Sequence, residues 1–189
     1  MADYKKEISG YFDRLSKVIK DVSRDEINKV MDLLVQARDK EKQIFTCGNG
    51  GSAATASHFV CDFNKGASFG KKKRFKFICL NDNVATMMAI ANDISYDDIF
   101  VEQLKNYCMP GDVVLAISGS GNSRNVLKAV EYANNMDAIT IGLTGFDGGQ
   151  LKKSAQYGIH IPVQDMQITE DLHMVLDHLM MKILAEKLS

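Results

Sequence analysis

The 189-residue sequence predicts an α/β protein, a three-layer α/β/α sandwich with a parallel sheet in the middle. From residue 43 onward, short β-favouring runs alternate with stretches of helical periodicity, as in consecutive βαβ units. Most of the strand-like runs are apolar throughout, which is typical of strands that helices cover on both faces. The five runs are QIFTC (43–47), FKFICL (75–80), DVVLAI (112–117), AITIGL (138–143) and GIHIPV (158–163).

Two helices are predicted before the first strand. Apolar residues between positions 5 and 22 recur at gaps of three, four and seven, which describes one face of a helix. Ser23 and Glu26 have the spacing of a capping box and predict the start of a second helix. The first helix has a wide apolar stripe and few partners of its own. We therefore expect it to wrap the domain or to pack on a second subunit.

The remaining helices are expected between and after the strands. They fall within SAATASHFVCDF, the segment 84–107, NSRNVLKAVEYAN, and the final stretch ITEDLHMVLDHLMMKILAEKL, for which Thr169 is a plausible N-cap. Because these units form one uninterrupted alternation, residues 1–189 are predicted to be a single domain. Residues 1–42 are then the N-terminal helices of this domain, and packing in an oligomer is one of the two arrangements expected for them.

Composition and charge narrow the functional classes. The formal net charge is −1, with 23 basic and 24 acidic residues, which does not resemble the electrostatic footprint of a nucleic-acid binder. No apolar run approaches the roughly 18 residues that span a bilayer, and the charged N-terminus does not resemble a signal peptide. The four cysteines form no CxxC pair and are expected to be free thiols. These features favour a cytoplasmic protein without a membrane or nucleic-acid partner.

The first glycine-rich loop, Gly48-Asn49-Gly50-Gly51-Ser52, joins a predicted strand to a predicted helix. Glycines let backbone amides approach a ligand closely, and a helix N-terminus adds unpaired N–H groups, so the loop favours phosphate. A tight turn without any ligand is the simpler alternative. Gly48, Gly50 and Ala53 also match the dinucleotide fingerprint, although Asp82 follows 29 residues after Ala53 instead of the usual 20 or so.

A second loop argues against a dinucleotide. Ser118-Gly119-Ser120-Gly121-Asn122-Ser123 follows the third predicted strand and again precedes a helix. Hydroxyls and amides together can satisfy the oxygens of a phosphate monoester. A serine-rich turn in which Ser123 only caps the helix is the alternative. Two such loops at neighbouring strand ends indicate a small phosphorylated ligand at one edge of the sheet.

Candidate acid, base and metal-binding groups lie on two helices. His58 and Asp62 are four residues apart and therefore share one helix face, with Cys61 as a competing ligand. The last helix supplies Glu170, His173, Asp177 and His178. Histidine with carboxylates suits a divalent ion such as Zn²⁺, and also proton transfer near neutral pH.

The separation of two of these groups limits how they can act together. Glu170 and His178 are eight residues apart, about 12 Å along a straight helix. Both can reach one ion only with long side-chain reaches or a distorted helix start. Otherwise one of them serves a site on another subunit. His178 lies beside the apolar stripe of its helix and is expected to point partly inward, whereas His173 could equally face solvent.

Taken together, these motifs resemble the sugar isomerase (SIS) domain family, most closely its sedoheptulose-7-phosphate (phosphoheptose) isomerase branch. The resemblance rests on GNGGS followed by HF-x-x-D, AND at 91–93, ISGSGNS at 117–123, and the terminal ED-L-H-x-x-x-x-H. It covers nearly the whole chain. It implies a flavodoxin-like SIS fold and a homotetramer with active sites between subunits. It also implies one zinc ion per subunit.

The activity that the resemblance implies is conversion of sedoheptulose 7-phosphate to D-glycero-D-manno-heptose 7-phosphate through an enediol. The product would serve bacterial lipopolysaccharide or capsule. His178 and Asp62 would form the acid/base pair, with Glu170 as the alternative base. The implied metal ligands are His58, Asp62, Glu170 and His178. The implied substrate-binding residues are Asn49, Gly50, Gly51, Ser52, Asp62, Asn92, Asp93, Ser118, Gly119, Ser120, Ser123 and Glu170.

Three positions depart from the family pattern. Asp62 stands where the branch has a catalytic glutamate, Glu170 where it has glutamine, and Gly119 where it has threonine. These changes leave the substrate open among phosphosugars. The alternative is a non-catalytic phosphosugar-binding regulator or scaffold, similar to the protein that associates with the bacterial replication initiator. The presence of all four implied metal ligands favours the enzyme.

Overall fold

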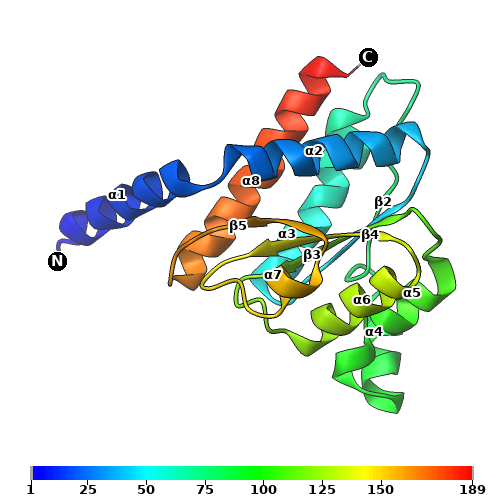
Figure 1. Ribbon diagram of the computed structural model, residues 1–189. Helices are drawn as coiled ribbons and strands as arrows, with labels where there is room; N and C mark the ends of the chain where they lie inside the picture. The colour runs from blue at the N-terminus through cyan, green and yellow to red at the C-terminus, as the bar shows by residue number, and fades with distance from the viewer. Residues whose placement is uncertain (1, 189) are drawn as a thin grey trace.

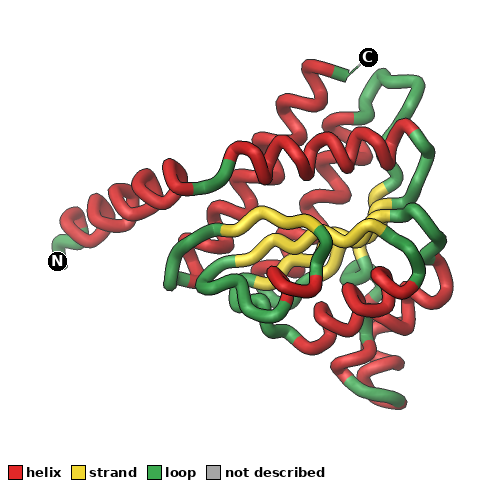
Figure 2. The backbone as a smooth tube through the Cα atoms, viewed as in Figure 1, coloured by secondary structure: helices red, strands yellow, loops and turns green. Residues whose placement is uncertain are grey.

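The computed structural model describes residues 2–188 and contains one five-stranded parallel sheet (Figures 1 and 2). The strand order β2-β1-β3-β4-β5 is the flavodoxin-like order, and helices lie on both faces. The predicted class is therefore confirmed. The strands are β1 Ile44–Cys47, β2 Phe77–Cys79, β3 Val113–Ser118, β4 Ile139–Thr144 and β5 Tyr157–His160.

The helices divide into two layers because side chains of each strand alternate between the two faces. Leu115 and Ile117 of β3 pack among residues of α2, α3 and α8, whereas Val114 and Ala116 pack among residues of α5 and α6. The helices are α1 Lys5–Asp21, α2 Arg24–Asp39, α3 Gly51–Cys61, α4 Val84–Asp93, α5 Val101–Tyr107, α6 Arg124–Asn135, α7 Leu151–Ser154 and α8 Met166–Lys187. Two shorter elements are the π-helix η1 Asp62–Ala67 and the 3-10 helix η2 Tyr96–Asp98.

Helix α1 extends away from the body of the molecule as an arm (Figure 1). Val18 is its one buried residue, and polar contacts tie its middle to α8. The hydroxyl of Tyr11 donates to Asp171 at 2.5 Å, and Arg14 pairs with Asp165 at 2.6 Å. The hydrogen bond to Asp171 is the main cause that raises the pKa of Tyr11 to about 12. Three residues of its predicted apolar stripe, Ile8, Phe12 and Ile19, are exposed.

Two helix starts differ from the predicted capping. Ser23 accepts the N–H of Glu26 at 3.2 Å, as expected, but the Glu26 carboxylate accepts the N–H of His160 in β5 instead of closing a capping box. Thr169 was predicted to cap the last helix, and this is wrong. Asp165 is the N-cap and accepts the N–H of Ile168, because α8 begins one turn earlier than its apolar stripe indicates.

None of the helices within residues 2–188 is both long and apolar enough to cross a membrane.

Candidate functional site

Helices α3 and α8 pack side by side and run in the same direction. The start of α3 at Gly51 meets Glu170, its middle at His58 meets His178, and the following π-helix at Gly66 meets Met181. The helices follow β1 and β5, so both begin at the carboxyl edge of the sheet. The seam between them brings together the groups that the sequence places more than 100 residues apart.

The two predicted loops line one cavity of about 280 Å³ at the start of this seam. Gly50 has φ of 55°, which glycine adopts without strain, and it turns the chain into α3. A Cβ at Gly51 would overlap the carboxylate of Glu170, so glycine permits that approach. The lining residues are Asn49, Gly50, Gly51, Ser52, Ile117, Ser118, Gly119, Ser120, Ser123, Met166 and Glu170.

The hydroxyls of the second loop face this cavity. Ser118 Oγ and Ser123 Oγ lie 3.2 Å apart, and Ser120 Oγ accepts the N–H of Asn122 at 3.3 Å. Ser123 occupies the N-cap position of α6, but its side chain makes no capping bond. Its hydroxyl therefore remains available to a ligand, as do those of Ser118 and Ser120. With the amides at the start of α3, these donors suit the oxygens of a phosphate group.

Asn49 is held in place by two residues that sequence reasoning missed. Its side-chain amide exchanges hydrogen bonds with Asn125, at 2.9 and 3.0 Å, and its Oδ1 also accepts from the Tyr96 hydroxyl at 2.8 Å. Asn125 is only 2% exposed. Its position two residues after Ser123 was the available signal, because a short polar side chain in the first helical turn can bond across to a neighbouring loop.

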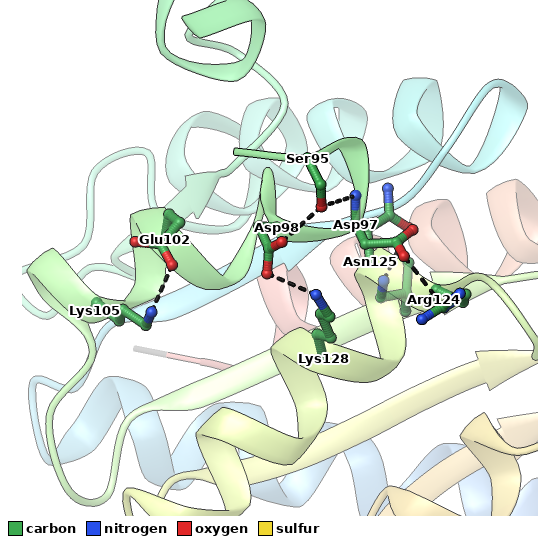
Figure 3. A network of polar contacts seen from close by, with 9 residues as sticks. Ser95, Asp97, Asp98, Glu102, Lys105, Arg124, Asn125 and Lys128 are labelled. Atoms are coloured by element: carbon green, nitrogen blue, oxygen red, sulfur yellow. Dashed lines mark hydrogen bonds and ion pairs between the residues drawn. The ribbon is translucent and has the colours of Figure 1, made fainter. Parts of the chain in front are cut away.

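The 3-10 helix η2, which carries Tyr96, is joined to α6 by a polar network (Figure 3). Asp98 accepts from Ser95 at 2.6 Å and from Lys128 at 2.8 Å, and Asp97 pairs with Arg124 at 3.1 Å. The hydrogen bond from Lys128 is the main cause that lowers the pKa of Asp98. The network fixes η2 against the helix that also carries Asn125.

Farther along the seam, His58, Asp62 and His178 form a cluster. The two Nε2 atoms lie 3.0 Å apart, and His58 Nε2 lies 3.6 Å from Asp62 Oδ1. Ligand atoms of all three residues lie within 4.8 Å of one another. Ligands of a tetrahedral zinc ion stand about 3.3 Å apart, so the spacing fits a divalent ion. The second oxygen of Asp62 is buried without a hydrogen-bond partner, which also fits a role in binding a cation.

Local structure explains why Asp62 points into the cluster. It is the C-cap of α3, four residues after His58, and the first residue of the π-helix η1. A π-helical turn is wider than an α-helical one, and such turns are frequent at functional sites. As the i, i+4 spacing predicts, the side chains of His58 and Asp62 lie on the same side of the chain. Cys61, the competing ligand, is exposed and outside the cluster.

Three predicted site residues are not part of the cluster formed by His58, Asp62 and His178. Glu170 lines the cavity instead. Asn92 and Asp93 lie at the exposed end of α4, where the amide of Asn92 donates to Asp93 at 2.8 Å. The cluster and the cavity are separated by about 10 Å, because His58 follows Gly51 by seven helical residues.

The inner face of α8 carries two buried polar residues. His173, left open between core and solvent, is fully buried, and burial is the main cause that lowers its pKa to about 4. Asp177 is also fully buried. Burial, reinforced by the negative charge of Asp62, raises its pKa to about 8. Neither side chain has a hydrogen-bond partner among the described residues. His178, by contrast, is exposed, although it was expected to point partly inward.

Comparison with known proteins agrees with this geometry. The SIS domain family matches residues 9–145. The phosphoheptose isomerase of Helicobacter pylori (strain ATCC 700392 / 26695) is 32% identical over 176 residues, which cover 93% of this chain and 91% of that protein. The phosphoheptose isomerase of Helicobacter hepaticus is 37% identical over 161 residues, covering 85% and 82%.

This chain belongs to the phosphoheptose isomerase family of SIS-domain proteins.

Solved structures of this family have the same fold. The phosphoheptose isomerase of Neisseria gonorrhoeae superposes with a TM-score of 0.89 at 26% identity, covering 97% of this chain and 100% of that one. The phosphoheptose isomerase of Francisella tularensis gives the same TM-score at 25% identity, covering 98% and 100%. The expected resemblance is therefore confirmed along nearly the whole chain.

Replacement of Asn125 by leucine should weaken binding of a sugar phosphate without unfolding the protein. Loss of two hydrogen bonds to Asn49 is expected to cost about 1–2 kcal/mol, or roughly 5- to 30-fold in affinity. Isothermal titration calorimetry measures the change. Asn135→Leu, an exposed site at the other end of α6, is the matched control. Equal affinities of the two variants would contradict the positioning role.

Proposed function

We propose that this protein interconverts sedoheptulose 7-phosphate and D-glycero-D-manno-heptose 7-phosphate through an enediol. The observation that carries the proposal is one helix seam with a cavity of about 280 Å³, lined by hydroxyls and backbone amides, at its start and a histidine–carboxylate cluster farther along. The relatives named above are phosphoheptose isomerases. A non-catalytic regulator or scaffold is not favoured, because such a role does not require the cluster of His58, Asp62 and His178. The product would enter heptose synthesis for surface polysaccharide.

Substrate binding begins with the terminal phosphate. We assign it to the cavity, where the amides of Gly50, Gly51 and Ser52 and the hydroxyls of Ser118, Ser120 and Ser123 supply donors beside Gly119. Binding energy from this phosphate would position the reacting end of the sugar. Asn49, fixed by Asn125, would contact the chain of the sugar. Asn92 and Asp93 stay predicted substrate contacts on the exposed end of α4.

Isomerisation requires a base that removes a proton from the carbon beside the carbonyl and an acid that protonates its neighbour. We assign His178 and Asp62 as this pair. His178 is exposed and can contact a substrate. Asp62 belongs to the same cluster, with its Oδ1 3.6 Å from His58 Nε2. Glu170 is the alternative base, because its carboxylate already lies inside the substrate cavity. Substrate could thus contact carboxylates at both ends of the seam.

We propose one Zn²⁺ per subunit, held by His58, Asp62 and His178. The converging imidazole nitrogens and the unpartnered Asp62 oxygen support this assignment. Glu170 stays a predicted fourth ligand, which would have to turn its side chain away from Gly51. A bound zinc ion would supply Lewis-acid stabilisation to the oxygens at the reacting carbons.

We further propose a homotetramer with active sites between subunits, in which residues 1–42 pack against other copies of this single 1–189 domain. Ile8 and Phe12 of α1 are 53% and 60% exposed. An apolar groove of about 410 Å³ between the end of α1, α2 and α8 lies nearby, lined by residues such as Ile19 and Leu179. Exposed apolar faces of this extent mark protein interfaces. The free cysteines support a cytoplasmic location.

Turnover of sedoheptulose 7-phosphate, followed by NMR of the sugar, tests the function. The wild type should form a heptose aldose phosphate, and chelation should reduce the rate. Asp62→Ala and His178→Ala should each lower kcat by about 10²- to 10⁴-fold, because each removes a proton-transfer group. Lys182→Ala, an exposed change on α8, is the control. Near-wild-type turnover in both variants would contradict the assignment, and no aldose from the wild type would contradict the activity.

Light scattering on a size-exclusion column tests the assembly. The wild type should have the mass of four chains, and the double variant Ile8→Ser/Phe12→Ser should have a lower mass. Because both side chains are exposed within one chain, the change should leave each subunit folded. Lys6→Ser/Asp13→Ser, on exposed positions of the same helix, should keep the wild-type mass. A monomeric wild type would contradict the proposal.

A further inference from the structure

The cavity at the start of the α3–α8 seam has an apolar side that the proposed mechanism does not use. Among its lining residues, Ile117 and Met166 are the two with apolar side chains. Ile117 is fully buried, whereas Met166 is half-buried on the first turn of α8. The thioether of Met166 is therefore the apolar side-chain surface that a ligand meets among the hydroxyls and amides of this cavity.

Met166 lies directly on the serine-rich loop at Gly119. A Cβ at Gly119 would be 2.6 Å from the Sδ of Met166 and 3.4 Å from its Cε, so the lack of a side chain at position 119 permits this contact. The carbonyl of Gly119 accepts the N–H of Gly145 at 2.8 Å, which ties the loop to the end of β4. The thioether thus lies beside the hydroxyls of Ser118 and Ser120, against backbone that is held in place.

The helix start that carries Met166 is also fixed. Asp165, the N-cap of α8, uses both carboxylate oxygens. Its Oδ1 accepts the N–H of Ile168 at 3.2 Å, and its Oδ2 accepts from Arg14 of the arm α1 at 2.6 Å. Because Met166 is the next residue, its backbone cannot move away from the cavity without loss of these contacts. The thioether is therefore a constant part of the cavity wall.

This wall distinguishes the two sides of a phosphate ester. The free oxygens of the phosphate require donors, which the serine hydroxyls and the backbone amides supply. A thioether supplies no donor and favours contact with carbon. A phosphate monoester satisfies both surfaces when its ester carbon lies against Met166. Inorganic phosphate has oxygen on every side, so one of its oxygens would lie unpaired against the sulfur, which is unfavourable.

We propose that Met166 is a specificity-determining residue that makes the cavity prefer phosphate monoesters to inorganic phosphate. The inference rests on the proposed function, which places the substrate phosphate in this cavity. It adds the orientation of that phosphate, with the ester carbon on the α8 side, against Met166, and the free oxygens on the side of the two loops. Gly119 is required in the same arrangement, because a side chain there would displace the thioether.

Calorimetry with ethyl phosphate and inorganic phosphate tests the preference, because the two probes differ by the ester group. The wild type should bind ethyl phosphate more tightly. Met166→Ala should reduce this preference by about fourfold, the contribution of one methylene group withdrawn from water. Met166→Leu keeps an apolar wall and should keep the preference. Gln167→Ala, at the exposed neighbouring position of α8, is the control and should behave as the wild type does.

The outcomes separate this inference from the function on which it rests. An unchanged preference in Met166→Ala, in a protein that binds ethyl phosphate, would overturn the role of Met166 and leave the phosphate cavity intact. Loss of the preference in Met166→Leu would also overturn it, because the apolar wall would not be the cause. A wild type that binds neither probe would contradict the assignment of phosphate to the cavity, and the inference with it.

A double-mutant cycle tests the contact between Met166 and Gly119. Gly119→Ala should weaken ethyl phosphate binding about fourfold or more in the wild-type background, because the new methyl group displaces the thioether from its place beside the ester carbon. In the Met166→Ala background the same change meets no thioether, and its effect should be less than about twofold. Equal effects of Gly119→Ala in the two backgrounds would overturn the inference.

Discussion

The parallel packing of α3 on α8 is the constraint on which the rest of the site depends. These helices follow strands at different positions in the sheet, and their contact sets where every polar group of the seam lies. Glycine at position 51 allows Glu170 to reach the cavity. The same register, about two turns farther along, brings His58 to His178 at 3.0 Å. A change in that register would move Glu170 away from Gly51 and His178 away from His58.

Much of this arrangement could be predicted from local sequence. The strands were predictable because short apolar runs between glycine-rich turns have few structures other than a buried strand open to them. The proximity of His58 and Asp62 was predictable because residues at i and i+4 share one face of a helix. The start of α8 was not predictable from its apolar stripe. The first turn of α8 carries Met166 over the cavity, and the capping bond of Asp165 lies before the periodic residues. Threonine is a residue type that often caps helices, but Thr169 lies inside α8.

Long-range contacts explain what local sequence could not predict. Asn125 and Tyr96 bond to Asn49 across separations of 76 and 47 residues, so only the folded chain shows that they orient it. Glu170 carries the expected carboxylate, but its position over Gly51 separates it from the cluster. His173 and Asp177 are polar residues on a buried helix face, where apolar residues are usual. Their burial is therefore evident from the structure and not from periodicity.

The structure gives one departure from the family pattern, Asp62 in place of glutamate, a physical explanation. Asp62 is one methylene shorter than the glutamate expected there, and it begins a π-helical turn that carries it into the cluster.

Anomalous scattering at the zinc edge, from crystals of metal-loaded protein, tests the account most directly. The account predicts one peak per subunit, within bonding distance of His58, Asp62 and His178. A peak elsewhere, or full metal loading without a peak at this cluster, would contradict it.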